Sequence, residues 1–344
     1  MKVSFSKLFK LINVLLLFAG SAFAQPCLNG WSYRTPIVVN NSNGSALANF
    51  QAKFVFNSQD LVVAGKAKAD GGDIRVLDKL GNNLSFWIQN GTYNKPTTII
   101  WVKLTSVNAA VIDSIYLFYG NKTSNNVSSG QSTFEFFDDF TGSFISPTRW
   151  NKCGGGNVTV AGGEVTLQSN NQASNAVIST KATFASPIVT EGFVNSVSEG
   201  IGFMGQINEA DSGWAMAYEK LGSGNKIMRM IALRDSNTSL TCIQHEDQVP
   251  NPNTEVAGAT SGIWKFDWHK DDTATVKWPG GSVTRMDTSM NSIYADPKHA
   301  VIGNLFNAGS LSIDWFRIRK HTDIEPILAL GAELQTITTV TLGQ

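Results

Sequence analysis

Short runs of β-branched and aromatic residues, separated by turn-forming residues, occupy most of this chain. Thr98 to Val102 reads Thr-Ile-Ile-Trp-Val and Ile115 to Tyr119 reads Ile-Tyr-Leu-Phe-Tyr, and both runs are typical of β-strands. Ala161-Gly162-Gly163 and Pro279-Gly280-Gly281 separate later runs in the manner of tight hairpins. Helical periodicity is nearly absent after the first 24 residues, so the pattern predicts an all-β protein.

The first 24 residues have a different character. Their first ten residues include three lysines; the apolar run from Leu11 to Phe18 follows, and the segment ends in Ala22-Phe23-Ala24. This order is typical of a secretory signal peptide cleaved near Ala24. The apolar run is shorter than the roughly 20 residues that a membrane-spanning helix needs. We therefore expect an extracellular or cell-surface protein with no membrane span in the mature chain.

The change of composition near residue 130 predicts two domains. Residues 121–133 are small and polar, as in a linker. Residues 25–130 carry 9 basic and 5 acidic groups, whereas residues 131–344 carry 15 basic and 22 acidic groups. The predicted organisation is a β-rich domain at 25–124, a linker at 125–133, a second β domain at 134–333 and a tail at 334–344.

Charge and motif content exclude several functions. The chain carries 27 basic and 27 acidic residues, and cleavage of the leader removes three lysines, so the mature chain has no general attraction to nucleic acid. Neither a phosphate-binding loop nor a Gly-x-Ser-x-Gly elbow is present. The histidines are scattered along the sequence without zinc-type spacing; they are His245, His269, His299 and His321.

Three cysteines remain in the exported chain: Cys27, Cys153 and Cys242. Two of them are expected to pair outside the cell. A disulfide between Cys153 and Cys242 is the preferred pair because both lie in the second domain. Three cysteines allow three pairings, and the sequence leaves the role of Cys27 open.

A first family resemblance covers about residues 29–124. It rests on five segments in a characteristic order: Gly30 to Ile37, Asp73 to Val76, Trp87-Ile88, Trp101 to Leu104, and Ile115 to Asn121. These segments resemble the domain of unknown function 2341 family, which occurs near the start of secreted bacterial surface proteins. The resemblance implies a small β-sandwich-like domain and transfers no functional residue.

A second resemblance covers about residues 134–331. Phe136 to Phe140, Pro147 to Trp150, the hairpin from Val158 to Leu167, Trp264 to Trp268 and Ile313 to Ile318 resemble the concanavalin A-like lectin and glucanase superfamily. The resemblance implies a jelly roll. Since one fold supports many functions, it does not by itself imply an activity.

The carboxylates expected of a glucanase are missing from the sequence. Such enzymes carry a Glu-x-Asp-x-(x)-Glu pattern on one strand, so that two carboxylates about 5 Å apart act as nucleophile and acid/base. Glu191 and Glu199 are separated by eight residues with no acid between them, and Glu209 with Asp211 falls in a predicted turn. We therefore expect no catalytic residues, with an atypical glycoside hydrolase as a remaining alternative.

Aromatic side chains near turns are the candidate ligand-binding residues. Trp214 follows the predicted turn that contains Asp211, and Trp278 precedes the Pro279 hairpin. Trp268 lies on a strand with alternating aromatic residues, which either face the core of the sandwich or form a sugar-stacking platform. Trp214, Asp211, Trp268 and Trp278 are the predicted site.

The lectin-like resemblance also implies a structural calcium ion. It would be held by Asp314, which opens the last strand, and by a backbone carbonyl of the first hairpin at Gly163. Asp314 also fits a simpler role as a turn residue that accepts backbone hydrogen bonds.

Together these observations predict a secreted or cell-surface protein that binds a polysaccharide or glycan without catalysis. The alternative is a structural adhesin or surface-assembly component that binds cell-surface proteins. The sequence leaves the ligand undefined.

Overall fold

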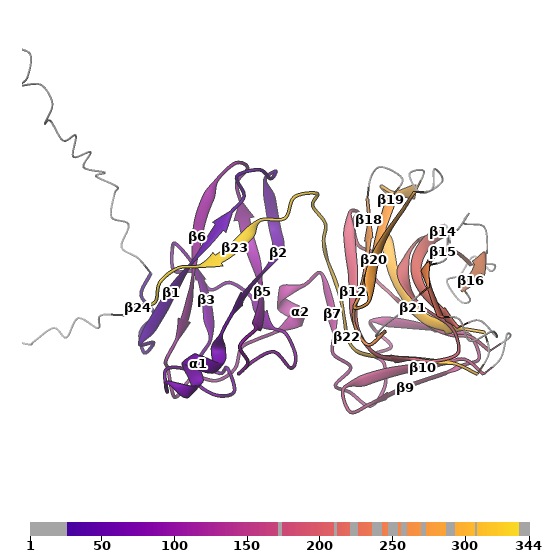
Figure 1. Cartoon of the computed structure of the whole chain (residues 1–344), viewed down its shortest axis with the longest axis horizontal. Coiled ribbons are helices and arrows are strands. Elements are labelled where there is room, and N and C mark those ends of the chain that lie inside the picture. The colour runs from indigo at the N-terminus through magenta and orange to yellow at the C-terminus, as the bar shows by residue number, and fades with distance from the viewer. Residues whose placement is uncertain are drawn as a thin grey trace, which may run out of the picture.

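A computed structural model describes ten segments of the chain: residues 26–170, 174–209, 212–220, 226–235, 243–246, 254–255, 260–269, 273–286, 293–306 and 308–336. The predicted signal peptide lies outside them. Two β-sandwiches stand side by side, joined by the short helix α2 (Gly130–Thr133) and by the strand β7 (Phe136–Asp138) (Figure 1). The predicted all-β fold is confirmed.

The first sandwich contains two antiparallel layers, which we call sheets A and B. Sheet A has the order β23 (Ile327–Leu330), β1 (Tyr33–Asn40), β6 (Ile112–Tyr119) and β3 (Arg75–Asp78), and β24 (Leu334–Gln335) also pairs with β1. Sheet B has the order β2 (Leu47–Phe56), β5 (Thr98–Val107) and β4 (Phe86–Ile88). The helix α1 (Ser58–Val63) follows β2.

Apolar residues of both sheets meet in one core between the layers. Ile37 on β1, Leu117 on β6, Phe54 on β2 and Ile100 on β5 are buried there. Trp31 covers the opposite face of sheet A, where its indole nitrogen donates to the carbonyl of Asp73. The Gly30 to Ile37 segment therefore supplies both the first strand and an aromatic cover for the sheet.

The end of the described chain returns to the first sandwich. Strand β23 pairs with β1 through Ile37 and Leu330, and the yellow segment crosses back over the junction between the sandwiches (Figure 1). The sequence pattern places this strand in the second domain, because its short apolar run has no feature that identifies a partner as distant in the sequence as Ile37 is from Leu330. The partner is β1, which pairs with β6 along one side and leaves its other side open for β23.

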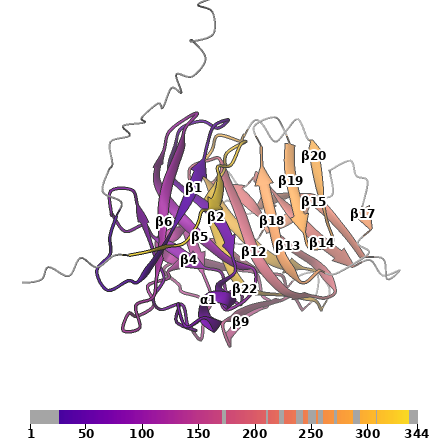
Figure 2. The same ribbon diagram turned by 60° about the vertical axis from the view of Figure 1, so that its left-hand side comes forward.

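The second sandwich is larger and also has two antiparallel layers, sheets C and D (Figure 2). Sheet C has the order β20 (Gly281–Met286), β19 (Thr273–Trp278), β18 (Gly262–Trp268), β12 (Ile188–Val197), β22 (Ser310–Lys320), β10 (Glu164–Gln168) and β9 (Asn157–Ala161), with β7 paired to β22. Sheet D has the order β16 (Ile243–Glu246), β15 (Lys226–Asp235), β14 (Ser212–Lys220), β13 (Gly200–Asn208), β21 (Lys298–Leu305), β11 (Ala176–Thr180) and β8 (Trp150–Cys153), with β17 (Thr254–Glu255) paired to β15.

The two large layers enclose an aromatic core, as the predicted jelly roll requires. Trp264, Phe266 and Trp268 point inward from β18 because alternate residues of a strand share a face. Met204 and Met216 meet them from sheet D. Both predicted hairpins are present: 161–163 joins β9 to β10, and 279–280 joins β19 to β20.

The residues predicted as a linker are packed between the two sandwiches. The hydroxyl of Ser129 accepts from the backbone of Ser132 and caps the start of α2. The backbone nitrogen of Ser129 also donates to the carbonyl of Phe86 in sheet B. These contacts anchor the connection to the first sandwich just before Phe134 enters the junction.

An aromatic cluster joins sheet B to the outer face of sheet C. Trp87 and Trp101 from sheet B contact Phe134, Phe137 and Trp315. The ring centres of Trp87 and Trp315 are 5.4 Å apart. The two sandwiches therefore share a buried aromatic interface, which we call the junction.

Within the described segments, no helix is long and apolar enough to cross a membrane.

Candidate functional site

The three predicted ligand-binding tryptophans lie inside the second sandwich. Trp214, Trp268 and Trp278 are 5%, 2% and 4% exposed and belong to the core between sheets C and D. Trp214 is already within β14, paired with Gln206, rather than at a loop tip. In this position the rings cannot stack on a sugar, which corrects the interpretation of these residues as a binding platform. Asp211 lies outside the described residues.

The carboxylates considered for catalysis do not form a pair in the described segments. Glu191 is buried on the outer face of sheet C and bonds to Arg317 and Arg319. Glu199, just before the start of β13, forms an ion pair with Lys220 at the end of β14. Glu209 is exposed after β13.

The predicted calcium ligands are near two further acids. A Cβ atom built on Gly163 would be 3.9 Å from the backbone oxygen of Asp139. Burial, followed by the nearby charges of Glu164 and Asp139, raises the pKa of Asp314. Asp139, Gly163, Glu164 and Asp314 therefore surround one region, which we call the acidic hairpin site.

The donors at the acidic hairpin site are all oxygens, the ligand type that calcium prefers. Gly163 adopts φ +80°, a left-handed conformation that turns the hairpin next to Asp139. The residues present thus fit a calcium ion. The sequence could have indicated Asp139 as a candidate because it lies in the Phe136 to Phe140 motif. Only the fold shows that Asp139 is close to Gly163.

The predicted disulfide stays a prediction. Cys153 is buried at the end of β8, opposite Val177 of β11. Cys242 lies outside the described residues. Cys27 is exposed, and its sulfur is 3.9 Å from a guanidinium nitrogen of Arg34.

A polar pocket opens where the two sandwiches meet, and we call it the junction pocket. Its volume is about 480 Å³, and its lining comes from the loop after β4, from residues 126–131 and from the segment after β7. Rings of Trp87, Tyr93 and Phe137 contribute to its wall. The polar lining residues are Asp70, Gln89, Asn90, Asn126, Ser128, Ser129, Gln131, Asp139 and Thr141.

Hydrogen bonds fix much of this lining. Ser128 accepts from the backbone of Ile88 at 2.8 Å, and Gln89 accepts from the indole of Trp101 at 3.2 Å. The hydroxyl of Tyr93 donates to the carbonyl of Lys68. Hydrogen bonds therefore fix the part of the pocket wall that comes from the loop after β4 and the part that comes from the connection between the sandwiches.

Three residues of the pocket lining with amide side chains are exposed to solvent: Asn90, Asn126 and Gln131. Amides and carboxylates beside aromatic rings suit a small polar ligand. Trp87, Ile88, Phe137 and Asp139 lie in the motifs that carry the two family resemblances. The exposed amides do not, because they come from separate loops without a sequence motif. Asp139 belongs to both the junction pocket and the acidic hairpin site.

Residues 70–153 match the model of a family described as a domain of unknown function (DUF2341). The match begins before β3 and extends through β8, so it spans the end of the first sandwich, the junction and the start of the second. No curated protein sequence matches the chain.

Several solved structures resemble part of the chain. The β-agarase A of Zobellia galactanivorans is 11% identical with a TM-score of 0.41, covering 54% of this chain and 89% of that one. The LamAcat structure from the same organism is 13% identical with a TM-score of 0.41, covering 54% and 97%. The β-agarase B of Zobellia galactanivorans is 12% identical with a TM-score of 0.39, covering 54% of this chain and 92% of that one. At these values the similarity carries no argument about activity.

Proposed function

We propose that this protein binds a carbohydrate at the junction pocket, outside the cell and without catalysing its cleavage. The single observation that supports this function is the pocket lining, where exposed amides lie near the half-buried ring of Tyr93 at the meeting point of the sandwiches. Sugars offer hydroxyl groups to amides and carboxylates, and a C–H face of a sugar can pack on the half-buried ring of Tyr93. The volume of about 480 Å³ lies within the range of about 300–1,000 Å³ that small-molecule sites occupy.

We further propose that a structural calcium ion at the acidic hairpin site supports this binding. Asp314, Asp139 and backbone oxygen near Gly163 would hold the ion. When bound, calcium supplies positive charge that offsets the repulsion between the neighbouring carboxylates. Asp139 would then be fixed at the wall of the pocket.

The test is glycan-array binding by the full chain without its leader, first with calcium and then with a chelator. We expect a defined glycan class to bind, and we expect chelation to weaken that binding. Gln131→Ala and Asn90→Ala remove pocket amides from exposed positions, so they should weaken binding without unfolding the protein. Asn43→Ala, at an exposed turn between β1 and β2, is the matched control.

Absence of any glycan signal from folded protein would exclude carbohydrate binding and favour the surface-assembly alternative. Binding that persists in both pocket variants would instead place the carbohydrate elsewhere on the molecule. Binding that is insensitive to chelator would remove calcium from the proposal.

A further inference from the structure

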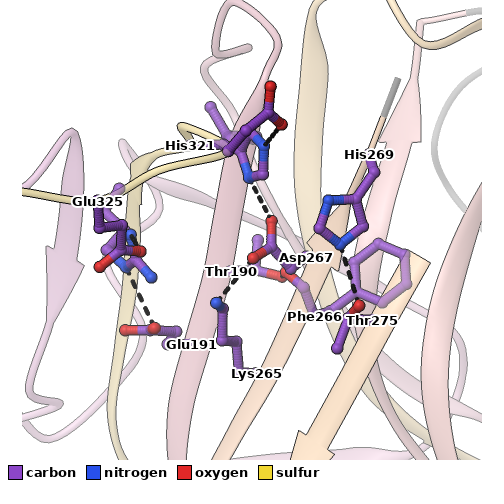
Figure 3. A network of polar contacts seen from close by, with 12 residues as sticks. Thr190, Glu191, Lys265, Phe266, Asp267, His269, Thr275, His321 and Glu325 are labelled. Carbon is purple, nitrogen blue, oxygen red and sulfur yellow. Dashed lines mark hydrogen bonds and ion pairs between the residues drawn. The ribbon is translucent and has the colours of Figure 1, made fainter. Parts of the chain in front are cut away.

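Asp267, His269 and His321 meet where β18 and β22 end in sheet C, and none of them lines the junction pocket. Asp267 and His269 lie on the same side of β18 and its continuation, and His321 directly follows β22. Their ligand-type atoms all lie within 4.8 Å of one another. Figure 3 shows His321 and His269 next to Asp267 on the outer side of the sheet. We call this group the His-Asp cluster.

Each member of the cluster has a second partner that fixes its orientation. Nε2 of His321 is 3.2 Å from Oδ1 of Asp323, and Nε2 of His269 is 3.0 Å from the hydroxyl of Thr275. The other edge of the His269 ring faces Asp267 and His321 (Figure 3). Metal-binding histidines commonly have such an outer oxygen partner, which leaves the second ring nitrogen for the ion.

The carboxylate of Asp267 is oriented in the same way. Its Oδ2 atom is 2.7 Å from the ammonium nitrogen of Lys265, while its Oδ1 atom is 2.7 Å from Nδ1 of His321. The side chains of Asp267 and His321 are 8% and 6% exposed, whereas His269 is half-buried. Asp267 and His321 are therefore enclosed, and solvent reaches the cluster from the side of His269.

From this geometry we propose that the His-Asp cluster binds a zinc-class divalent ion through Nδ1 of His269, Nδ1 of His321 and Oδ1 of Asp267. The hydrogen bond between His321 and Asp267 accounts for the proximity of these two residues. It does not account for His269, whereas a bound ion would use all three side chains. Two imidazoles with one carboxylate form a common three-residue zinc set, with water completing the tetrahedral geometry. The all-oxygen acidic hairpin site suits calcium, so the two sites differ in the ion they select.

The cluster also links two parts of the fold. Asp267 and His269 belong to the second sandwich, whereas His321 begins the segment that returns to β23 in the first. An ion bound there would hold the return segment against β18. Binding should therefore raise the thermal unfolding midpoint of the whole chain, because an ion that binds only the folded state stabilises it.

The experiment is titration of the untagged, chelator-treated full chain with Zn²⁺, followed by calorimetry, with Co²⁺ absorption spectra as a second readout. We expect one ion per chain, together with the visible Co²⁺ bands of a tetrahedral nitrogen and oxygen site. His269→Gln and His321→Gln should each weaken Zn²⁺ binding by more than about tenfold and remove the tetrahedral Co²⁺ bands. Glu325→Gln, which changes an acid of the same segment that pairs with Arg319, should leave both readouts unchanged.

His269 is half-buried, so His269→Gln should remain folded even if His321→Gln does not, and circular dichroism checks this. Equal Zn²⁺ affinity in folded His269→Gln and in the original chain would overturn the site. The same conclusion follows if the original chain binds no Zn²⁺, or if its Co²⁺ spectrum shows only octahedral water-like coordination.

Discussion

Arg317 occupies an unusual position for a charged side chain because aromatic rings surround it inside the junction. Its guanidinium carbon is 4.0 Å from the ring centre of Trp101, 4.6 Å from Trp315 and 4.8 Å from Phe134. Its Nε donates to Glu191 at 2.6 Å. Nη1 has no hydrogen-bond partner in the described segments, so the ring faces provide its favourable contact. Charge and aromatic packing therefore depend on each other at this position.

Replacing Glu191 should destabilise the protein strongly. Glu191→Gln leaves the buried charges of Arg317 and Arg319 without their carboxylate, and loss of one partner of a buried pair costs about 3–5 kcal/mol. The measurement is the free energy of unfolding in urea. Asp113→Asn breaks the exposed pair with Lys79 and, as the control, should cost less than about 1 kcal/mol. Equal losses in both variants would contradict a structural role for the buried pair.

Acid should remove the contribution of Glu191. Burial acts to raise the pKa of Glu191, but Arg317, Arg319 and Lys265 outweigh burial and lower it from 4.5 to about 2. A carboxyl whose pKa is lower in the folded state stabilises the protein above its unfolded pKa, and this contribution is lost as the pH falls toward the folded value. The stability difference between the original chain and Glu191→Gln should therefore shrink between pH 4.5 and about 2. A constant difference over this range would contradict the ionised pair.

At the scale of elements, β23 completes sheet A along the open edge of β1. Leu328 and Leu330 pack against the core of the first sandwich, and the carboxylate of Glu333 accepts from the hydroxyl of Tyr119. The sequence identifies most strands because β-branched runs and glycine hairpins are local signals. It does not identify the partner of β23, because pairing across the whole chain depends on tertiary packing.

Removing this strand should weaken the first sandwich. A chain that ends at residue 326 leaves the edge of β1 unpaired and exposes its apolar contacts. We expect the thermal midpoint of the first sandwich to fall by at least about 4 °C, because a loss above roughly 1 kcal/mol has that effect in a domain of about 100 residues. A chain that ends at residue 336 keeps β23 and β24 and is the control. Identical midpoints would show that β23 contributes little.

At the scale of the whole molecule, the candidate sites arise from segments that are distant in the sequence. The junction pocket combines loops from residues 70–93 with residues 126–141. The His-Asp cluster unites two strand ends that β12 separates in sheet C, so the scattered histidine spacing gave no sign of it. By contrast, alternation alone predicted that Trp264, Phe266 and Trp268 share one face of their strand, since that feature requires only local geometry. It did not decide between the core and a sugar-stacking platform, and the fold shows that this face lies in the core.

The return of the chain to its first strand has a consequence for the order in which the protein is synthesised and folds. A ribosome produces β1 early, but its neighbour β23 emerges only after every strand of the second sandwich. Until then the nascent first sandwich presents an open strand edge, a surface on which other chains can pair. The incomplete first sandwich is therefore more prone to aggregate than the finished chain, and the last strand of the sheet protects the edge of β1.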